Sequence, residues 1–81
     1  MVKVLFFARL RQQLGTGEIT LGDFSGSLGD LRTILCEQHP DWSAQLQRDD
    51  IRMALNQELA EPEAMVNSGD EVAFFPPVTG G

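Results

Sequence analysis

The first hydrophobic pattern along the chain is that of a β-strand. Residues 2–8 are rich in β-branched and aromatic side chains, and apolar groups stand on both faces of the alternation. One face carries Val2, Val4 and Phe6, and the other carries Lys3, Leu5 and Phe7. Because both faces are apolar, the pattern predicts a strand in the middle of a sheet.

Two shorter elements are expected next. Residues 9–14 can form a short helical turn that stops at Gly15. Residues 18–24 then alternate again, which predicts a second strand. The two strands would form a hairpin with a long connection.

One amphipathic helix is predicted over residues 28–38, where apolar side chains recur at helical spacing. These side chains are Leu28, Leu31, Ile34 and Leu35. Ser27 is suited to be the N-cap, with Asp30 at the third helical position. Pro40 is expected to end the helix.

The second half of the chain alternates strands and turns. We expect a strand at residues 51–55, a tight turn at 56–58, a short return strand at 59–60, a turn at 67–70 and a last strand at 71–75. Asn56 tolerates the left-handed conformation that the first of these turns needs. Pro76-Pro77 ends the last strand.

These elements predict an α+β fold. With one main helix to cover one sheet face, the economical architecture is a mixed sheet packed on that helix, the β-grasp arrangement. The first and last strands would then be parallel neighbours in the middle of the sheet. We expect a single domain over residues 1–77, because 81 residues supply only one core, followed by a flexible tail at residues 78–81.

Charge and cysteine content narrow the function. Six basic and twelve acidic residues give a net charge of −6, which disfavours binding to nucleic acid and to anionic membranes. The charge fits a basic partner, or solubility alone. A single cysteine, Cys36, indicates a reducing compartment, the cytoplasm by default. No apolar run is long enough to span a membrane.

The residue pattern predicts neither an ordinary catalytic site nor a metal site. The single histidine, His39, falls at the predicted helix C-terminus, where we expect it to interact with the helix dipole. Cys36 lacks a neighbouring cysteine or basic cluster, which predicts a partly buried structural thiol. The acidic pairs Asp49-Asp50 and Glu61/Glu63 are expected on solvated loops. We therefore expect the chain to bind no cofactor of its own.

The segment after the last strand is the remaining candidate. Pro76-Pro77 is followed by Val78-Thr79-Gly80-Gly81, and the free carboxylate of Gly81 is the special chemical group of this segment. The alternative is that the segment is an ordinary frayed terminus without a function. The run Phe-Phe-Pro-Pro-Val-Thr-Gly-Gly resembles the end of the MoaD family, the small sulfur-carrying subunits of molybdopterin synthase. Residues 4–11, 27–35 and 54–58 are similar to that family as well.

The resemblance implies a ubiquitin-like β-grasp whose chemistry is carried by Gly81. A partner enzyme would use ATP to adenylate the Gly81 carboxylate, and a sulfur donor would convert it into a thiocarboxylate. The large subunit of molybdopterin synthase, expected as two copies with two small subunits, would supply the catalytic groups. The thiocarboxylate sulfur would attack a cyclic pterin precursor and build the dithiolene of molybdopterin. Gly80, Thr79 and Val78 would carry the reacting group into the partner.

A partner interface is also predicted from the strand alternation. Phe7 and Phe75 are expected to point away from the helix-covered face, with Leu59 of the return strand beside them. Three other functions stay open at this point: a sulfur carrier for a thiazole or a thiolated nucleoside, a protein modifier joined to lysines, and a plain binding module with an incidental Gly-Gly end.

Overall fold

The computed structural model describes residues 1–77, which form a sheet with helices packed on one side. In chain order the elements are β1 (Val2–Phe6), α1 (Ala8–Leu14), β2 (Glu18–Leu21), β3 (Gly26–Ser27), α2 (Leu28–Gln38), η1 (Pro40–Trp42), α3 (Ser43–Leu46), β4 (Arg52–Leu55), β5 (Glu58–Leu59), β6 (Met65–Val66) and β7 (Glu71–Phe75).

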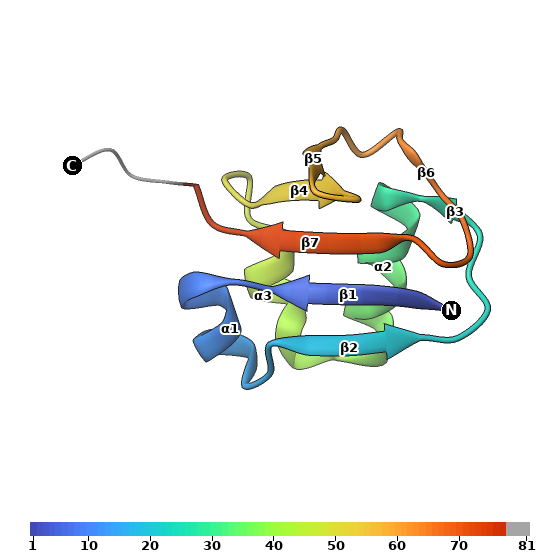
Figure 1. Cartoon of the computed structure of the whole chain (residues 1–81). Coiled ribbons are helices and arrows are strands. Elements are labelled where there is room, and N and C mark those ends of the chain that lie inside the picture. Colours follow the sequence, from blue (N-terminus) through green and yellow to red (C-terminus); the bar gives the residue numbers. More distant parts are fainter. Residues whose placement is uncertain (78–81) are drawn as a thin grey trace.

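Strand pairing confirms the predicted architecture. The five-stranded sheet has the order β2-β1-β7-β4-β5, as Figure 1 shows. β1 runs parallel to β7, with Phe6 opposite Phe74, and the other pairs in this sheet are antiparallel. The mixed sheet and its main helix α2 are those of the β-grasp fold.

The capping residues of α2 explain where this helix begins. The Ser27 hydroxyl accepts a hydrogen bond from the backbone N–H of Asp30 at 3.0 Å. The backbone N–H of Ser27 in turn donates to Asp30 Oδ2 at 3.2 Å. This capping box satisfies two N–H groups at the helix start. The predicted bounds, Leu28–Gln38, are confirmed.

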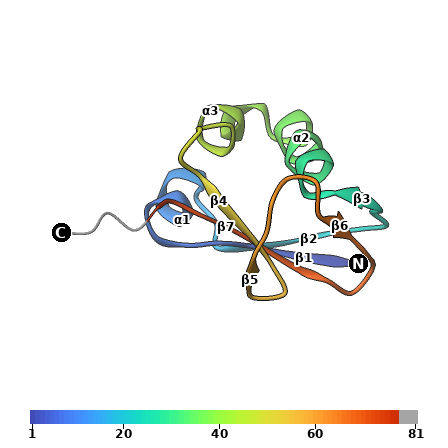
Figure 2. The same ribbon diagram turned by 90° about the horizontal axis from the view of Figure 1, so that it is seen from above.

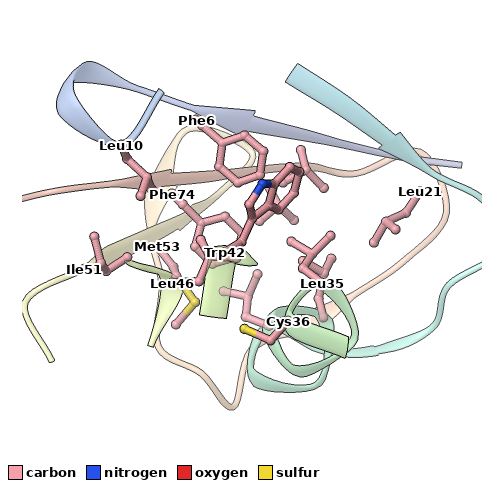
Figure 3. Close-up of a cluster of buried hydrophobic side chains, with 14 of the residues drawn as sticks. Phe6, Leu10, Leu21, Leu35, Cys36, Trp42, Leu46, Ile51, Met53 and Phe74 are labelled. Carbon is pink, nitrogen blue, oxygen red and sulfur yellow. The ribbon is translucent and has the colours of Figure 1, made fainter. Parts of the chain in front are cut away.

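The core lies between the sheet and the helices. Figure 2 shows α2 and α3 on the same side of the sheet. On that side the rings of Phe6 and Phe74 stack with centroids 5.9 Å apart, and Trp42 meets Phe6 edge-on at 5.4 Å (Figure 3). Leu10 and Leu14 of α1 are also buried. We call the other side of the sheet the open face, because the helices of residues 1–77 leave it uncovered.

Two short helical segments after α2 were not predicted. Pro40 follows the end of α2, as expected, but it also begins η1, and α3 continues from there. Proline fits the first turn of a helix because its missing N–H would have no partner there. Trp42 and Leu46 are buried, so this segment extends the helix layer over the core.

Two strands are shorter than predicted. β1 ends at Phe6, because Ala8 takes a φ of 56° and begins α1. β2 ends at Leu21, because the chain bends at Gly22-Asp23, and Phe24 therefore lies outside the strand.

The remaining differences concern short strands. The return strand is Glu58–Leu59 rather than residues 59–60, and β4 begins at Arg52 rather than at residue 51. β3 and β6 form a separate two-stranded sheet that was not predicted. Each has only two residues, too few to show a hydrophobic period.

Candidate functional site

The candidate carrying segment follows directly from the middle of the sheet. β7 ends at Phe75, and the partly buried Pro76-Pro77 comes next. Proline fixes φ near −65°, so the backbone direction after β7 is restricted at two successive residues. Val78, Thr79, Gly80 and Gly81 lie outside the described residues, and their predicted roles and the predicted flexibility of the tail stay predictions.

An apolar hollow lies on the open face, beside the end of β7. The side chain of Leu59 is 76% exposed, Phe7 is 46% exposed, and Phe75 is half-buried. The full lining of this apolar hollow is Leu5, Phe7, Ala54, Gln57, Leu59, Glu71, Ala73 and Phe75. The structure therefore brings together the three residues that sequence reasoning selected as a partner interface.

Strand register explains the shape of the apolar hollow. Ala73 of β7 lies between Leu5 of β1 and Ala54 of β4, and Ala54 in turn pairs with Leu59 of β5. One row across the sheet thus has small residues in its centre and large residues at both ends. Ala54 and Ala73 form the floor of the apolar hollow, and larger side chains at these two positions would fill the hollow. Sequence reasoning missed this floor, because it depends on the register between strands far apart in the chain.

A tight turn holds the β4–β5 hairpin that carries Leu59. Asn56 and Gln57 have φ values of 51° and 72°, and positive φ at both central residues is typical of a type I′ turn. The Asn56 side chain accepts a hydrogen bond from the backbone N–H of Glu71 at 3.0 Å and donates to Asp70 Oδ1 at 3.2 Å. The hairpin is therefore tied to the start of β7.

Hydrogen bonds beside this turn lower the pKa of the Asp70 carboxylate. Asp70 Oδ2 accepts a hydrogen bond from the backbone N–H of Asn67 at 2.8 Å. This bond, and after it the bond from Asn56, hold the pKa of Asp70 below its usual range. Both bonds favour the ionised form, so the anion helps to position the hairpin.

Other reactive side chains lie apart from the apolar hollow. Cys36 on α2 is buried within the core, more deeply than the predicted partial burial (Figure 3). The ring of His39 stacks on Trp42, with centroids 3.8 Å apart, a contact that sequence reasoning missed. Asp49, Glu61 and Glu63 are exposed, and Asp50 forms an ion pair with Arg48 at 2.8 Å.

Neither a metal cluster nor a membrane helix occurs in the part of the chain that the structure describes. Within residues 1–77, histidine, cysteine, aspartate and glutamate side chains do not gather in groups of three or more that could hold a metal ion. Over the same residues, every helix is too short or too polar to cross a membrane.

Comparisons with known proteins agree with this picture. Residues 4–81 match the ThiS family. The molybdopterin synthase sulfur carrier subunit of Haemophilus influenzae is 41% identical over 81 residues, which cover 100% of both chains.

Solved structures share the fold over nearly the whole chain. SAMP1 from Haloferax volcanii, a small archaeal modifier protein, has a TM-score of 0.82 at 29% identity and covers 99% of this chain and 98% of its own. A chain from the complex of subunits 1 and 2 of the molybdopterin-converting factor of Helicobacter pylori has a TM-score of 0.69 at 26% identity, covering 99% and 97%. Over its whole length the chain is similar to a molybdopterin synthase sulfur carrier subunit. The family match and this full-length relative together show that the chain belongs to the ThiS family of ubiquitin-like β-grasp proteins.

Proposed function

We propose that this chain is the sulfur carrier subunit of a molybdopterin synthase. The observation that carries the proposal is the 41% identity with the Haemophilus influenzae carrier over the whole of both chains. The apolar hollow supports it, because a carrier must dock on its partners through a surface that the fold itself does not use. The cytoplasm fits this activity, since the composition, with one cysteine, suits a reducing compartment.

The reacting group in this proposal is the carboxylate of Gly81. An α-carboxylate has a pKa of about 3.3–3.7, so at neutral pH it is an anion and a poor electrophile. An adenylating partner would transfer AMP from ATP to it and release pyrophosphate. A sulfur donor would then displace AMP and leave a thiocarboxylate. Attack of this sulfur on a cyclic pterin precursor, followed by hydrolysis of the acyl bond, would return the carboxylate.

Geometry supports a division of labour between carrier and partner. Residues 78–81 can span at most about 13–14 Å when extended, which is enough to enter a pocket while the domain stays outside. Gly80 and Gly81 lack Cβ atoms and would pass a narrow channel in backbone conformations closed to other residues. The catalytic groups and the ATP site would belong to the partners, the large synthase subunit and the adenylating enzyme. Two copies of each synthase subunit would form the assembly.

Mass measurement of the intact chain tests the proposal. After incubation with the adenylating enzyme, ATP and a sulfur donor, one oxygen of Gly81 should be replaced by sulfur. Removing Gly81 displaces the reacting carbon by roughly 3 Å or more, and misplacement by about 1 Å can cost on the order of 100-fold in rate. A chain that ends at Gly80 should therefore form no product, yet unfold at the same temperature as the full chain.

Two outcomes would contradict the proposal. One is sulfur found on Cys36, with loss of carrying in Cys36→Ala. The other is normal molybdopterin formation by the chain that ends at Gly80. Gly80→Ala is the finer variant, because one methyl group should slow sulfur transfer without unfolding the domain.

A second candidate function is protein modification. The specific observation in its favour is the likeness to SAMP1, a small archaeal modifier protein, at 29% identity. A modifier would be joined through Gly81 to lysines of other proteins. Covalent adducts that survive boiling in detergent would identify this function, and they would be absent for a pure sulfur carrier.

A further inference from the structure

Basic side chains are gathered at the end of the molecule where β7 leaves the sheet. Two hollows there are both lined by Arg48, Ile51 and Pro77. Together they contain four of the six basic residues of the chain, which we name the basic collar. The basic collar consists of Arg9, Arg32, Arg48 and Arg52.

Acidic side chains around the basic collar offset much, but not all, of its positive charge. Three acidic residues, Asp49, Asp50 and Glu61, line the same two hollows. The other two basic residues of the chain share the remaining surface with nine acidic ones. With four basic residues against three acidic ones, the region around Pro77 is slightly positive, whereas the chain as a whole has a net charge of −6.

The arginines of the basic collar differ in how they are held. Arg48 donates two hydrogen bonds to Asp50, at 3.0 and 2.8 Å, which offsets its charge. Arg32 on α2 and Arg52 on β4 form no ion pair with any of residues 1–77. The same holds for Arg9, but Arg32 and Arg52 line one hollow together with Leu59 and Phe75. Arg32 and Arg52 are therefore the members of the basic collar that lie beside the apolar hollow.

The basic collar is continuous with the apolar hollow. Arg52 lies directly opposite Phe75 in the β4–β7 register. Leu59 and Phe75 line both the apolar hollow and the hollow that contains Arg32 and Arg52. A protein that covers Leu59 and Phe75 must also lie over Arg52.

We propose that Arg32 and Arg52, with the rest of the basic collar, form a recognition site for an acidic segment of the protein that docks on the apolar hollow. This proposal rests on the proposed function, which supplies the docking. Complementary charges at the edge of an interface speed association and fix its register. A nucleic acid is disfavoured as the occupant because the remaining surface repels a polyanion.

A peptide titration tests the basic collar without either partner. The probe is hexaglutamate with blocked ends, added to the ¹⁵N-labelled chain at 20 mM and 300 mM salt. The peptide should shift the amide signals of residues around Arg32 and Arg52 at low salt and lose this effect at high salt, where screening is strong. The Arg32→Gln/Arg52→Gln variant should bind the peptide about two- to thirtyfold more weakly, since it removes two exposed pairs worth about 0.2–1 kcal/mol each.

Arg11→Gln is the control for the single variant Arg52→Gln, because it also removes one positive charge but from a residue that lines neither of the two hollows. It should change peptide binding less than twofold. Equal weakening by Arg11→Gln, or shifts scattered over the whole chain, would overturn the proposal. So would collar-specific shifts with AMP, or tighter binding of a thymidine hexanucleotide, because these would identify a phosphate or nucleic-acid site instead.

Association kinetics with the large synthase subunit and with the adenylating enzyme separate this proposal from the proposed function. For at least one partner, Arg52→Gln should lower the association rate about two- to fivefold, with a weaker salt dependence than the unmodified chain. If the unmodified chain binds neither partner, the proposed function fails while the peptide titration still decides the basic collar. If it binds both and the double variant binds as well, the basic collar proposal alone fails.

Discussion

Both faces of β1 and β7 carry apolar residues, but the helices cover only one of the two faces. Phe74 faces the helices and is fully buried, whereas the next residue, Phe75, faces away and is half-buried. In β1, Phe6 is fully buried, while Phe7, which directly follows the strand, is 46% exposed. The difference arises from the helix layer, since the alternation along both strands is the same. Apolar residues on the covered face thus stabilise the fold, and those on the open face are available for binding.

Replacing the two neighbouring phenylalanines should show the largest effect of this difference. Phe74→Ala removes a fully buried side chain and should cost about 3–5 kcal/mol of unfolding free energy. Phe75→Ala should cost much less, because part of that ring already meets solvent. Urea unfolding of both variants measures the two values. If Phe74→Ala does not fold, Phe74→Leu is the milder replacement. Equal costs at residues 74 and 75 would contradict the functional split between the faces.

Binding should show the reverse order. Leu59→Ala should weaken docking on the large synthase subunit by about 1–3 kcal/mol, as central interface residues often do, with little change in stability. Met65→Ala is the control, because Met65 is also exposed, at 59%, but lies on β6 outside the apolar hollow. Titration calorimetry compares the two variants. Unchanged affinity for Leu59→Ala, or an equal loss for Met65→Ala, would show that the open face is not the docking surface.

The smallest expected effect concerns the pH dependence of the hairpin beside the apolar hollow. Hydrogen bonds, first from the backbone of Asn67 and then from Asn56, lower the pKa of Asp70 in the folded chain. The unfolded chain releases this proton near pH 3.9. Asp70 therefore contributes stability above that pH, and the contribution is lost as pH falls through the lower folded pKa.

Thermal unfolding of Asp70→Asn between pH 2.5 and 6 measures this contribution. The variant should be less stable than the unmodified chain at pH 6, and the difference should shrink towards pH 2.5. Asp50, whose pKa is lowered mainly by its hydrogen bond with Arg48, stays in both chains and contributes the same slope to each. A difference that does not change with pH would mean that the Asp70 charge has no role in holding the hairpin.

Sequence reasoning predicted the elements whose signals are local. The capping box of α2 needs only Ser27 and Asp30, three positions apart, and both bounds of that helix were correct. β7 was also predicted with correct bounds, because an apolar run stands between a turn and two prolines. The parallel pairing of β1 and β7 followed from the need to cover a single sheet with a single main helix.

What sequence reasoning missed depends on distant parts of the chain or on backbone strain. β3 is a strand because residues 26–27 pair with residues 65–66, far along the chain. β1 stops early because Ala8 adopts a positive φ that alanine rarely takes. The basic collar escaped notice because its arginines are spread between residues 9 and 52 and meet only in the folded chain. The apolar residues of the docking surface were predicted, but its alanine floor was not.

The parallel pairing of β1 with β7 has a consequence for synthesis on the ribosome. Phe6 and Glu71 are 65 positions apart, so β1 must wait for nearly the whole chain before its central partner exists. At roughly 5–20 residues per second this delay is about 3–13 s. The docking face is built across β1, β7, β4 and β5, and residues 78–81 follow β7 after Pro76-Pro77. A product terminated before β7 would lack this face, so it could not occupy a partner and block it with an end that carries no sulfur.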